Sequence, residues 1–89
     1  MNWFNTNSYR ATVQAWGREF EVCTDWCMRY WETMVFPVVD GERDCGTEVY
    51  VYQCETEDLA AANFDYVVAN IDAVVAAWLL KTALEKVQE

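Results

Sequence analysis

Residues 9–26 read YRATVQAWGREFEVCTDW, two runs in which apolar and polar side chains alternate around a glycine. Alternation with a period of two is typical of β-strands that bury one face. Gly17-Arg18 has the glycine-first composition of a two-residue type II′ turn, so we expect an antiparallel hairpin with its turn there.

The turn fixes a register that can be checked against the side chains. It places an apolar set on one face, with the pairs Tyr9/Trp26, Ala11/Thr24, Val13/Val22 and Ala15/Phe20. The other face is mostly polar, with the pairs Arg10/Asp25, Thr12/Cys23, Gln14/Glu21 and Trp16/Glu19. Turn and alternation therefore predict the same hairpin, with one face toward a core.

The next segments predict a second hairpin. Residues 28–39 alternate like a strand, although Trp26, Tyr30 and Met34 also fit a short helical face, and we favour the strand. Pro37 has no N–H for a ladder, which predicts that this strand lies at a sheet edge or bends. Residues 40–46 have the glycines and charges of an exposed loop, and residues 47–54 form the following strand.

From Thr56 onward the apolar period changes to that of a helix. Thr56 is the expected N-cap, followed by acids in the first turn. A stripe of apolar residues at helical spacing then runs toward the C-terminus. One unbroken helix would overhang strands of ordinary length. We therefore expect either a break near Asn63 or Asn70, or an overhanging end that packs on another chain.

These elements together predict an α+β fold over residues 1–89. The expected domain is a mostly antiparallel sheet of about four strands, in two hairpins, with a long C-terminal helix packed on one face. Eighty-nine residues leave no room for a second core.

Composition excludes several function classes. The chain has six Lys and Arg against fifteen Asp and Glu, a formal net charge of -9, which disfavours direct nucleic-acid binding. It contains no histidine, so no Ser-His-Asp triad, Cys-His dyad or His-ligated metal can be built from it alone. Phosphate-binding glycine motifs and nucleophile elbows are also missing. We expect a protein that is not an enzyme and needs no cofactor.

The start of the chain, MNWFNTNS, lacks a basic segment and an apolar run, which favours a cytoplasmic location over secretion. Asn63, Asp65, Asn70 and Asp72 interrupt the most apolar stretch and argue against a membrane span. Four cysteines would then stay reduced. Cys23 and Cys27 have the spacing of a zinc knuckle but Cys45 and Cys54 do not, so we expect ordinary thiols and no metal.

The excess acid is concentrated in one third of the chain. Residues 32–58 hold eight acids against Arg43 alone. Extended chain between Glu48 and Glu55 spans about 23 Å, so the acids fall into two separate clusters, one around the loop and one at the helix start. On a continuous helix, Asp58, Asp65 and Asp72 would also form an acidic ridge about 21 Å long.

Such carboxylates can imitate phosphates toward a basic groove, although acidic loops are commonly only solvated surface. The chain is also rich in Trp and Tyr, types enriched in interface anchors. Trp16, on the polar hairpin face, and Trp3 are the expected exposed anchors. The candidate partner-binding residues are Asp40, Glu42, Asp44, Glu48, Glu57, Asp58, Asp65, Asp72 and Trp16.

In size and charge the chain resembles the small acidic inhibitors made by phages and mobile elements, including anti-CRISPR proteins and DNA mimics. This resemblance covers no particular residue. It implies a non-enzymatic inhibitor that binds the basic, nucleic-acid-binding surface of a host protein complex. The alternative is an assembly or adaptor module, homodimeric through a helix stripe at Ile71, Val75, Trp78 and Leu79.

Overall fold

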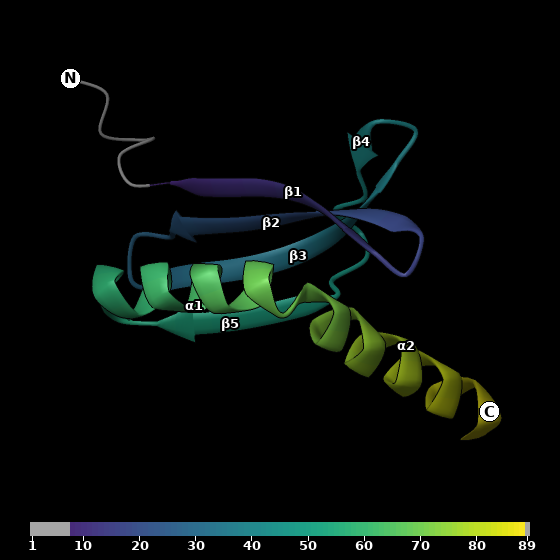
Figure 1. Ribbon diagram of the computed structural model, residues 1–89. Coiled ribbons are helices and arrows are strands. Elements are labelled where there is room, and N and C mark those ends of the chain that lie inside the picture. Colours follow the sequence, from purple (N-terminus) through teal and green to yellow (C-terminus); the bar gives the residue numbers. More distant parts are fainter. Residues whose placement is uncertain (1–7, 89) are drawn as a thin grey trace.

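Two helices lie against one face of an antiparallel sheet in the computed structural model, which describes residues 8–88 (Figure 1). The strands are β1 (Tyr9–Ala15), β2 (Arg18–Trp26), β3 (Trp31–Val39), β4 (Glu42–Arg43) and β5 (Tyr50–Cys54). The helices are α1 (Glu57–Ala69) and α2 (Ile71–Gln88). This arrangement confirms the α+β class that the sequence predicts.

The first hairpin turns one residue earlier than the sequence suggested. Its two loop residues are Trp16 and Gly17, with φ angles of 55° and 73°. Two positive φ angles belong to a type I′ turn, whose twist matches that of the strands, and not to type II′. Ala15 consequently pairs with Arg18.

The predicted register is therefore wrong by two residues, but the predicted faces are correct. Tyr9 pairs with Thr24 and not with Trp26. A shift of two residues keeps every side chain on its face, because successive side chains alternate. Phe20 and Val22 on the predicted apolar face are fully buried.

The edge position expected for residues 28–39 is also wrong, because β3 lies inside the sheet. It pairs with β2 on one side and with both β5 and β4 on the other. The carbonyl of Pro37 accepts a hydrogen bond from the N–H of Asp44 at 2.8 Å, so its peptide edge faces this second side. Pro37 lies between Val35, which pairs with β5, and Val38, which pairs with β4. The missing N–H of Pro37 thus lies at the point along β3 where the neighbouring strand changes from β5 to β4.

The expected loop at residues 40–46 contains a second tight turn. Asp40 and Gly41 have φ angles of 54° and 81°, and Val39 pairs with Glu42 across them. β4 is the short strand that follows. β5 begins at Tyr50, three residues later than the predicted strand.

The C-terminal helix is broken at Asn70, one of the two predicted positions. The axes of α1 and α2 differ by 80°. The main-chain N–H and the side-chain Nδ2 of Asn70 both donate to the carbonyl of Tyr66, at 2.9 and 2.8 Å. At the other candidate position, Asn63, α1 continues unbroken. The second half of α2 then extends beyond the sheet, so the overhanging end is present as well (Figure 1).

The core lies between the sheet and the inner faces of the helices. Its fully buried side chains include Phe20, Val22, Val35, Val67 and Val75. Trp78 packs edge-on against Phe20, with ring centroids 6.4 Å apart. No single helix in residues 8–88 is long and apolar enough to cross a membrane; only the bent pair of α1 and α2 together has the required length and hydropathy.

Candidate binding surfaces

The predicted acids are nearly all on the surface. Seven of them are exposed: Asp40, Glu42, Asp44, Glu48, Asp58, Asp65 and Asp72. Glu57 is partly buried and its carboxylate accepts a hydrogen bond from the hydroxyl of Tyr9 at 3.2 Å. Desolvation, together with the negative charge of Glu57, raises the pKa of Tyr9. Glu57 therefore fastens α1 to β1 and is the least available of the set.

Five of the candidate acids lie at two ends of the sheet. Asp40, Glu42 and Asp44 surround β4, whereas Glu57 and Asp58 begin α1 beyond the far end of β5 (Figure 1). Asp44 also holds its own loop together, because its carboxylate accepts hydrogen bonds from the N–H of Gly46 at 3.1 Å and the hydroxyl of Thr47 at 2.9 Å.

The predicted acidic ridge is broken. The 80° bend at Asn70 moves Asp72 off the line through Asp58 and Asp65. Those two remain on the exposed side of α1, about 10 Å apart at 1.5 Å per residue. Leu59 and Tyr66 form a second line with the same spacing and are 53% and 58% exposed. We call these four residues the outer face of α1.

Within residues 8–88 the ion pairs that form use other acids. Arg10 pairs with Asp25 and Arg43 with Glu21, each at 2.9 Å. Both pairs lie on the sheet face opposite the helices. The sequence predicted that Arg10 and Asp25 lie directly opposite each other on β1 and β2. In the structure Arg10 lies opposite Cys23, so the ion pair with Asp25 runs diagonally across the two strands. Arg18 is held elsewhere, 5.4 Å from the ring centroid of Trp78.

The set of exposed tryptophans differs from the predicted set. Trp16 is 61% exposed, as expected, but it sits in the turn rather than in a strand. Its indole Nε1 donates to the main-chain carbonyl of Asp72 at 2.8 Å. Trp26, placed on the buried face by sequence, is 49% exposed and packs beside Trp31 with centroids 5.7 Å apart. Trp3 lies outside the described residues.

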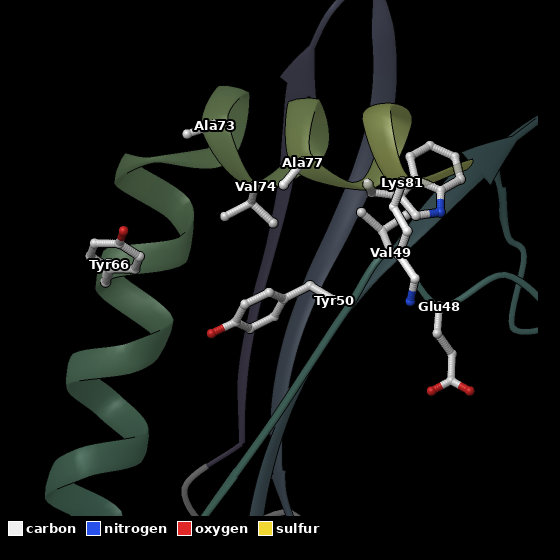
Figure 2. A pocket seen from close by; sticks show the side chains of 9 residues that line it. Glu48, Val49, Tyr50, Tyr66, Ala73, Val74, Ala77 and Lys81 are labelled. Carbon is white, nitrogen blue, oxygen red and sulfur yellow. The ribbon is translucent and has the colours of Figure 1, made fainter. Parts of the chain in front are cut away.

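An open groove of about 400 Å³ lies where α1, α2 and the start of β5 meet (Figure 2). Ala73, Val74 and Ala77 form the α2 wall, and Val49 and Tyr50 belong to the β5 side. Tyr66, Trp78, Glu48 and Lys81 complete the lining. Sequence reasoning missed this groove, because it depends on the bend at Asn70, whose angle no local pattern gives.

The alternative hypothesis of a homodimer used the helix stripe at Ile71, Val75, Trp78 and Leu79, and most of this stripe packs into the core of the domain. Ile71 and Val75 are buried, and Trp78 packs against Phe20. Only Leu79 is substantially exposed, at 37%. The residues that stay exposed on α2 lie on other sides of the helix and include Leu80, Leu84 and Val87.

The four cysteines are free thiols. Desolvation raises the pKa of Cys23 and of Cys27, and the charge of Glu32 adds to the shift at Cys27. Among residues 8–88 no three His, Cys, Asp or Glu side chains form an arrangement that could hold a metal ion. Cys45 is the exposed thiol of the four.

Comparison with protein-family models, with curated proteins and with solved structures finds no match to this chain.

Proposed function

We propose that this protein is a small, non-enzymatic inhibitor that binds the basic, nucleic-acid-binding surface of a protein complex, with carboxylates in place of phosphates. The observation that carries the proposal is that seven of the eight candidate acids, all except Glu57, are exposed, while the ion pairs formed within residues 8–88 use Glu21 and Asp25. The negative potential of the candidate acids is thus directed to solvent and to partners.

The distribution of arginine supports this reading. Arg10, Arg43 and Arg18 are engaged on the sheet face or against aromatic rings. Partner binding would neutralise the exposed acids without first breaking either of the ion pairs that form within residues 8–88. Electrostatic attraction of that kind accelerates association and is weakened by salt.

The outer face of α1 combines charge with apolar contact. Asp58 and Asp65 run beside Leu59 and Tyr66, all on exposed positions of one helix. Interfaces gain affinity mainly from buried aromatic and aliphatic anchors, while rim charges set the rate and the partner. The outer face of α1 thus presents both apolar anchors and negative charges to a basic protein surface.

The test begins with immobilised protein and a nuclease-treated lysate of the source cell, eluted by a salt gradient. The expected result is a nucleic-acid-binding complex that elutes at raised salt and is displaced by added DNA or RNA. Binding of the purified complex is then measured for two charge-reversal variants, Asp58→Lys/Asp65→Lys and Glu42→Lys/Glu48→Lys. Glu19→Lys, on the sheet face, is the control for added positive charge.

At least one double variant should lower the association rate and its salt dependence, with an unchanged circular dichroism spectrum. The variant that does so identifies the acidic cluster in contact. Equal association rates for the wild type, both double variants and the control would refute the proposal. So would a captured complex that nucleic acid does not displace.

A further inference from the structure

β1 is an edge strand, with β2 on one side and no other strand of residues 8–88 on the other. Ala15 and Arg18 flank the two-residue turn, and such a turn hydrogen-bonds the pair that flanks it. Hydrogen-bonded pairs alternate along an antiparallel ladder, so every second residue of β1 directs its main-chain N–H and C=O away from β2. The residues with these outward main-chain groups are Arg10, Thr12 and Gln14.

The side chains of β1 that face the helices are less covered than those of β2. Val13 lies opposite Phe20, and Ala11 lies opposite Val22. Phe20 and Val22 are fully buried, whereas Val13 and Ala11 are only partly buried. β1 also lacks the usual features that keep edge strands unpaired, since it contains no proline or lysine and its ladder with β2 has no bulge. One further strand beside β1 would cover these side chains and pair the outward main-chain groups.

Helix α1 places two carboxylates beside this edge. The hydroxyl of Tyr9 donates to Glu57 at 3.2 Å, and the ring of Tyr9 lies 5.6 Å from the ring of Phe64. Asp58 and Asp65 each follow one of these contacts by a single residue, a rotation of about 100° around the helix. Desolvation raises the pKa of Tyr9 most, followed by the charge of Glu57. The charges of Asp65 and Asp58 add to this shift, so both acids lie near β1.

The direction of the rotation follows from the contact of α1 with β5. Asn63 donates to the hydroxyl of Tyr50 on β5 at 3.0 Å, so position 63 faces the β5 side of the sheet. The next residue, Phe64, faces Tyr9 on β1. A further step in the same direction carries Asp65 beyond β1, to the side where the edge of the sheet is open.

We propose that β1 accepts an extended basic segment of the protein partner as an added strand, with Lys or Arg side chains directed at Asp58 and Asp65. This inference rests on the proposed function and specifies which element of the partner binds there. Side chains on one side of a strand recur about every 6.6 Å, so two or three of them pass the roughly 10 Å between the two acids. In such additions the main-chain hydrogen bonds give affinity and the alternate side chains give specificity.

Charge favours this occupant over a second copy of the chain. Two copies paired antiparallel through β1 would form one continuous sheet with all helices on the same face. The flanks of α1 that carry Asp58 and Asp65 would then face each other across the junction. Each copy has a formal net charge of -9, and like charges in this arrangement repel. A strand with Lys or Arg at alternate positions would instead neutralise both acids.

The probe is an octapeptide of alternating Lys and Thr with blocked ends, titrated into the full chain and followed by amide chemical shifts in NMR spectra. In an antiparallel addition the peptide threonines lie opposite the outward residues of β1 and exchange hydrogen bonds with them, while the lysines face Asp58 and Asp65. The amide resonances of Arg10, Thr12 and Gln14 should therefore shift, because their N–H groups gain acceptors.

Two N-methylated forms of the peptide test the ladder without changing the protein. An N-methyl group removes a main-chain donor and keeps every charge. Methylation of all the threonines and methylation of all the lysines block opposite edges of the peptide. One form should thus bind at least about tenfold more weakly than the other, the threonine form if the addition is antiparallel and the lysine form if it is parallel. Equal affinities of the two forms, or β1 amides that do not shift at about 1 mM peptide, would overturn the proposal.

Protein variants test the two parts of the site. Asp65→Lys should weaken binding of the unmethylated peptide at least about fivefold. Glu85→Lys is the matched control, because it makes the same change of charge at an exposed position of α2 beyond the sheet (Figure 1). Thr12→Pro removes an outward N–H of β1 that the ladder with β2 does not use, and it should also weaken binding. Circular dichroism establishes that each variant is folded. Equal weakening by Asp65→Lys and Glu85→Lys would overturn the proposal, because net charge alone would then explain binding.

The same variants separate this inference from the proposed function. A captured complex that binds folded Thr12→Pro as tightly as the wild type, but does not bind Asp58→Lys/Asp65→Lys, would overturn strand addition and leave the proposed function standing. The expected pattern of peptide binding, without capture of any nucleic-acid-binding complex, would support strand addition and refute the proposed function.

Discussion

The indole Nε1 of Trp16 donates a 2.8 Å hydrogen bond to the main-chain carbonyl of Asp72, across 56 residues of sequence. It joins the turn between β1 and β2 to the first turn of α2. Asp72 stands directly after the bend at Asn70, so this bond holds the position from which α2 leaves the sheet. An exposed tryptophan thereby has a structural role that its exposure alone would not suggest.

Trp16→Phe should lower the free energy of unfolding by about 1 kcal/mol, because it keeps the ring and removes the indole donor. Trp16→Asn should cost less, since Asn tolerates the left-handed conformation at φ 55° better than a bulky residue. Urea unfolding followed by circular dichroism measures both. A smaller loss for Phe than for Asn would contradict the role given to the indole.

The N-terminal cap of α1 gives a second prediction. The hydroxyl of Thr56 accepts a hydrogen bond from the N–H of Leu59 at 3.3 Å, as the sequence predicted. Thr56→Ala should lower the free energy of unfolding by about 1 kcal/mol, and Thr56→Ser should lower it much less because serine retains the hydroxyl acceptor. For a domain of this size the loss corresponds to a fall of about 4–8 °C in Tm. Equal Tm values for the Ala and Ser variants would show that the cap contributes nothing.

The sequence patterns predicted the features that depend on neighbouring residues, such as which face of a strand is buried. Alternation assigned the faces of β1 and β2 correctly even though the turn was misplaced, because a two-residue shift leaves the faces unchanged. The type II′ interpretation of Gly17-Arg18 was wrong because Gly17 is the second residue of the turn, and Trp16, with a φ angle of 55°, takes the first left-handed position. The hydrogen bond from Trp16 to Asp72 helps to hold Trp16 there, and no local pattern contains it.

The binding surfaces were predictable only in part. Exposure of acids such as Asp58 and Asp65 follows from charge and helical spacing. The loss of the ridge and the groove beside Tyr50 both follow from the 80° bend. A helix break is visible in sequence, but its angle is set by packing against the sheet.

Thr24 and Thr33 provide a test of the buried polar contact between β2 and β3. Their hydroxyl oxygens are 2.7 Å apart and both residues are essentially inaccessible to solvent. Thr24→Val or Thr33→Val alone should cost about 1–3 kcal/mol, because the remaining hydroxyl loses its partner in the core. The double variant should recover most of that loss, since two methyl groups of similar shape then meet. Additive single losses in the double-mutant cycle would mean that the two hydroxyls are not coupled.

Burial of Cys23 predicts how stability changes at alkaline pH. Desolvation raises the pKa of this thiol above its ordinary value of 9.0, so the folded state favours the neutral form. Below that ordinary value both states keep the proton and stability is unaffected. As pH rises past it the unfolded chain ionises first, and the free energy of unfolding should fall. The pKa of Cys27 is also raised. The substitution Cys23→Ala should therefore remove only the part of the alkaline destabilisation that comes from the Cys23 thiol.

The measurement is the urea midpoint of the wild type and of Cys23→Ala, from neutral pH to beyond 9.0, the ordinary pKa of the thiol. Cys45→Ala is the control, because that thiol is exposed. The alkaline loss should be smaller in Cys23→Ala than in the wild type and the control. Alkylation of the folded protein provides an independent readout, with Cys45 modified first and Cys23 only after unfolding. Equal alkaline losses in all three proteins, or early alkylation of Cys23, would contradict the burial of its thiol.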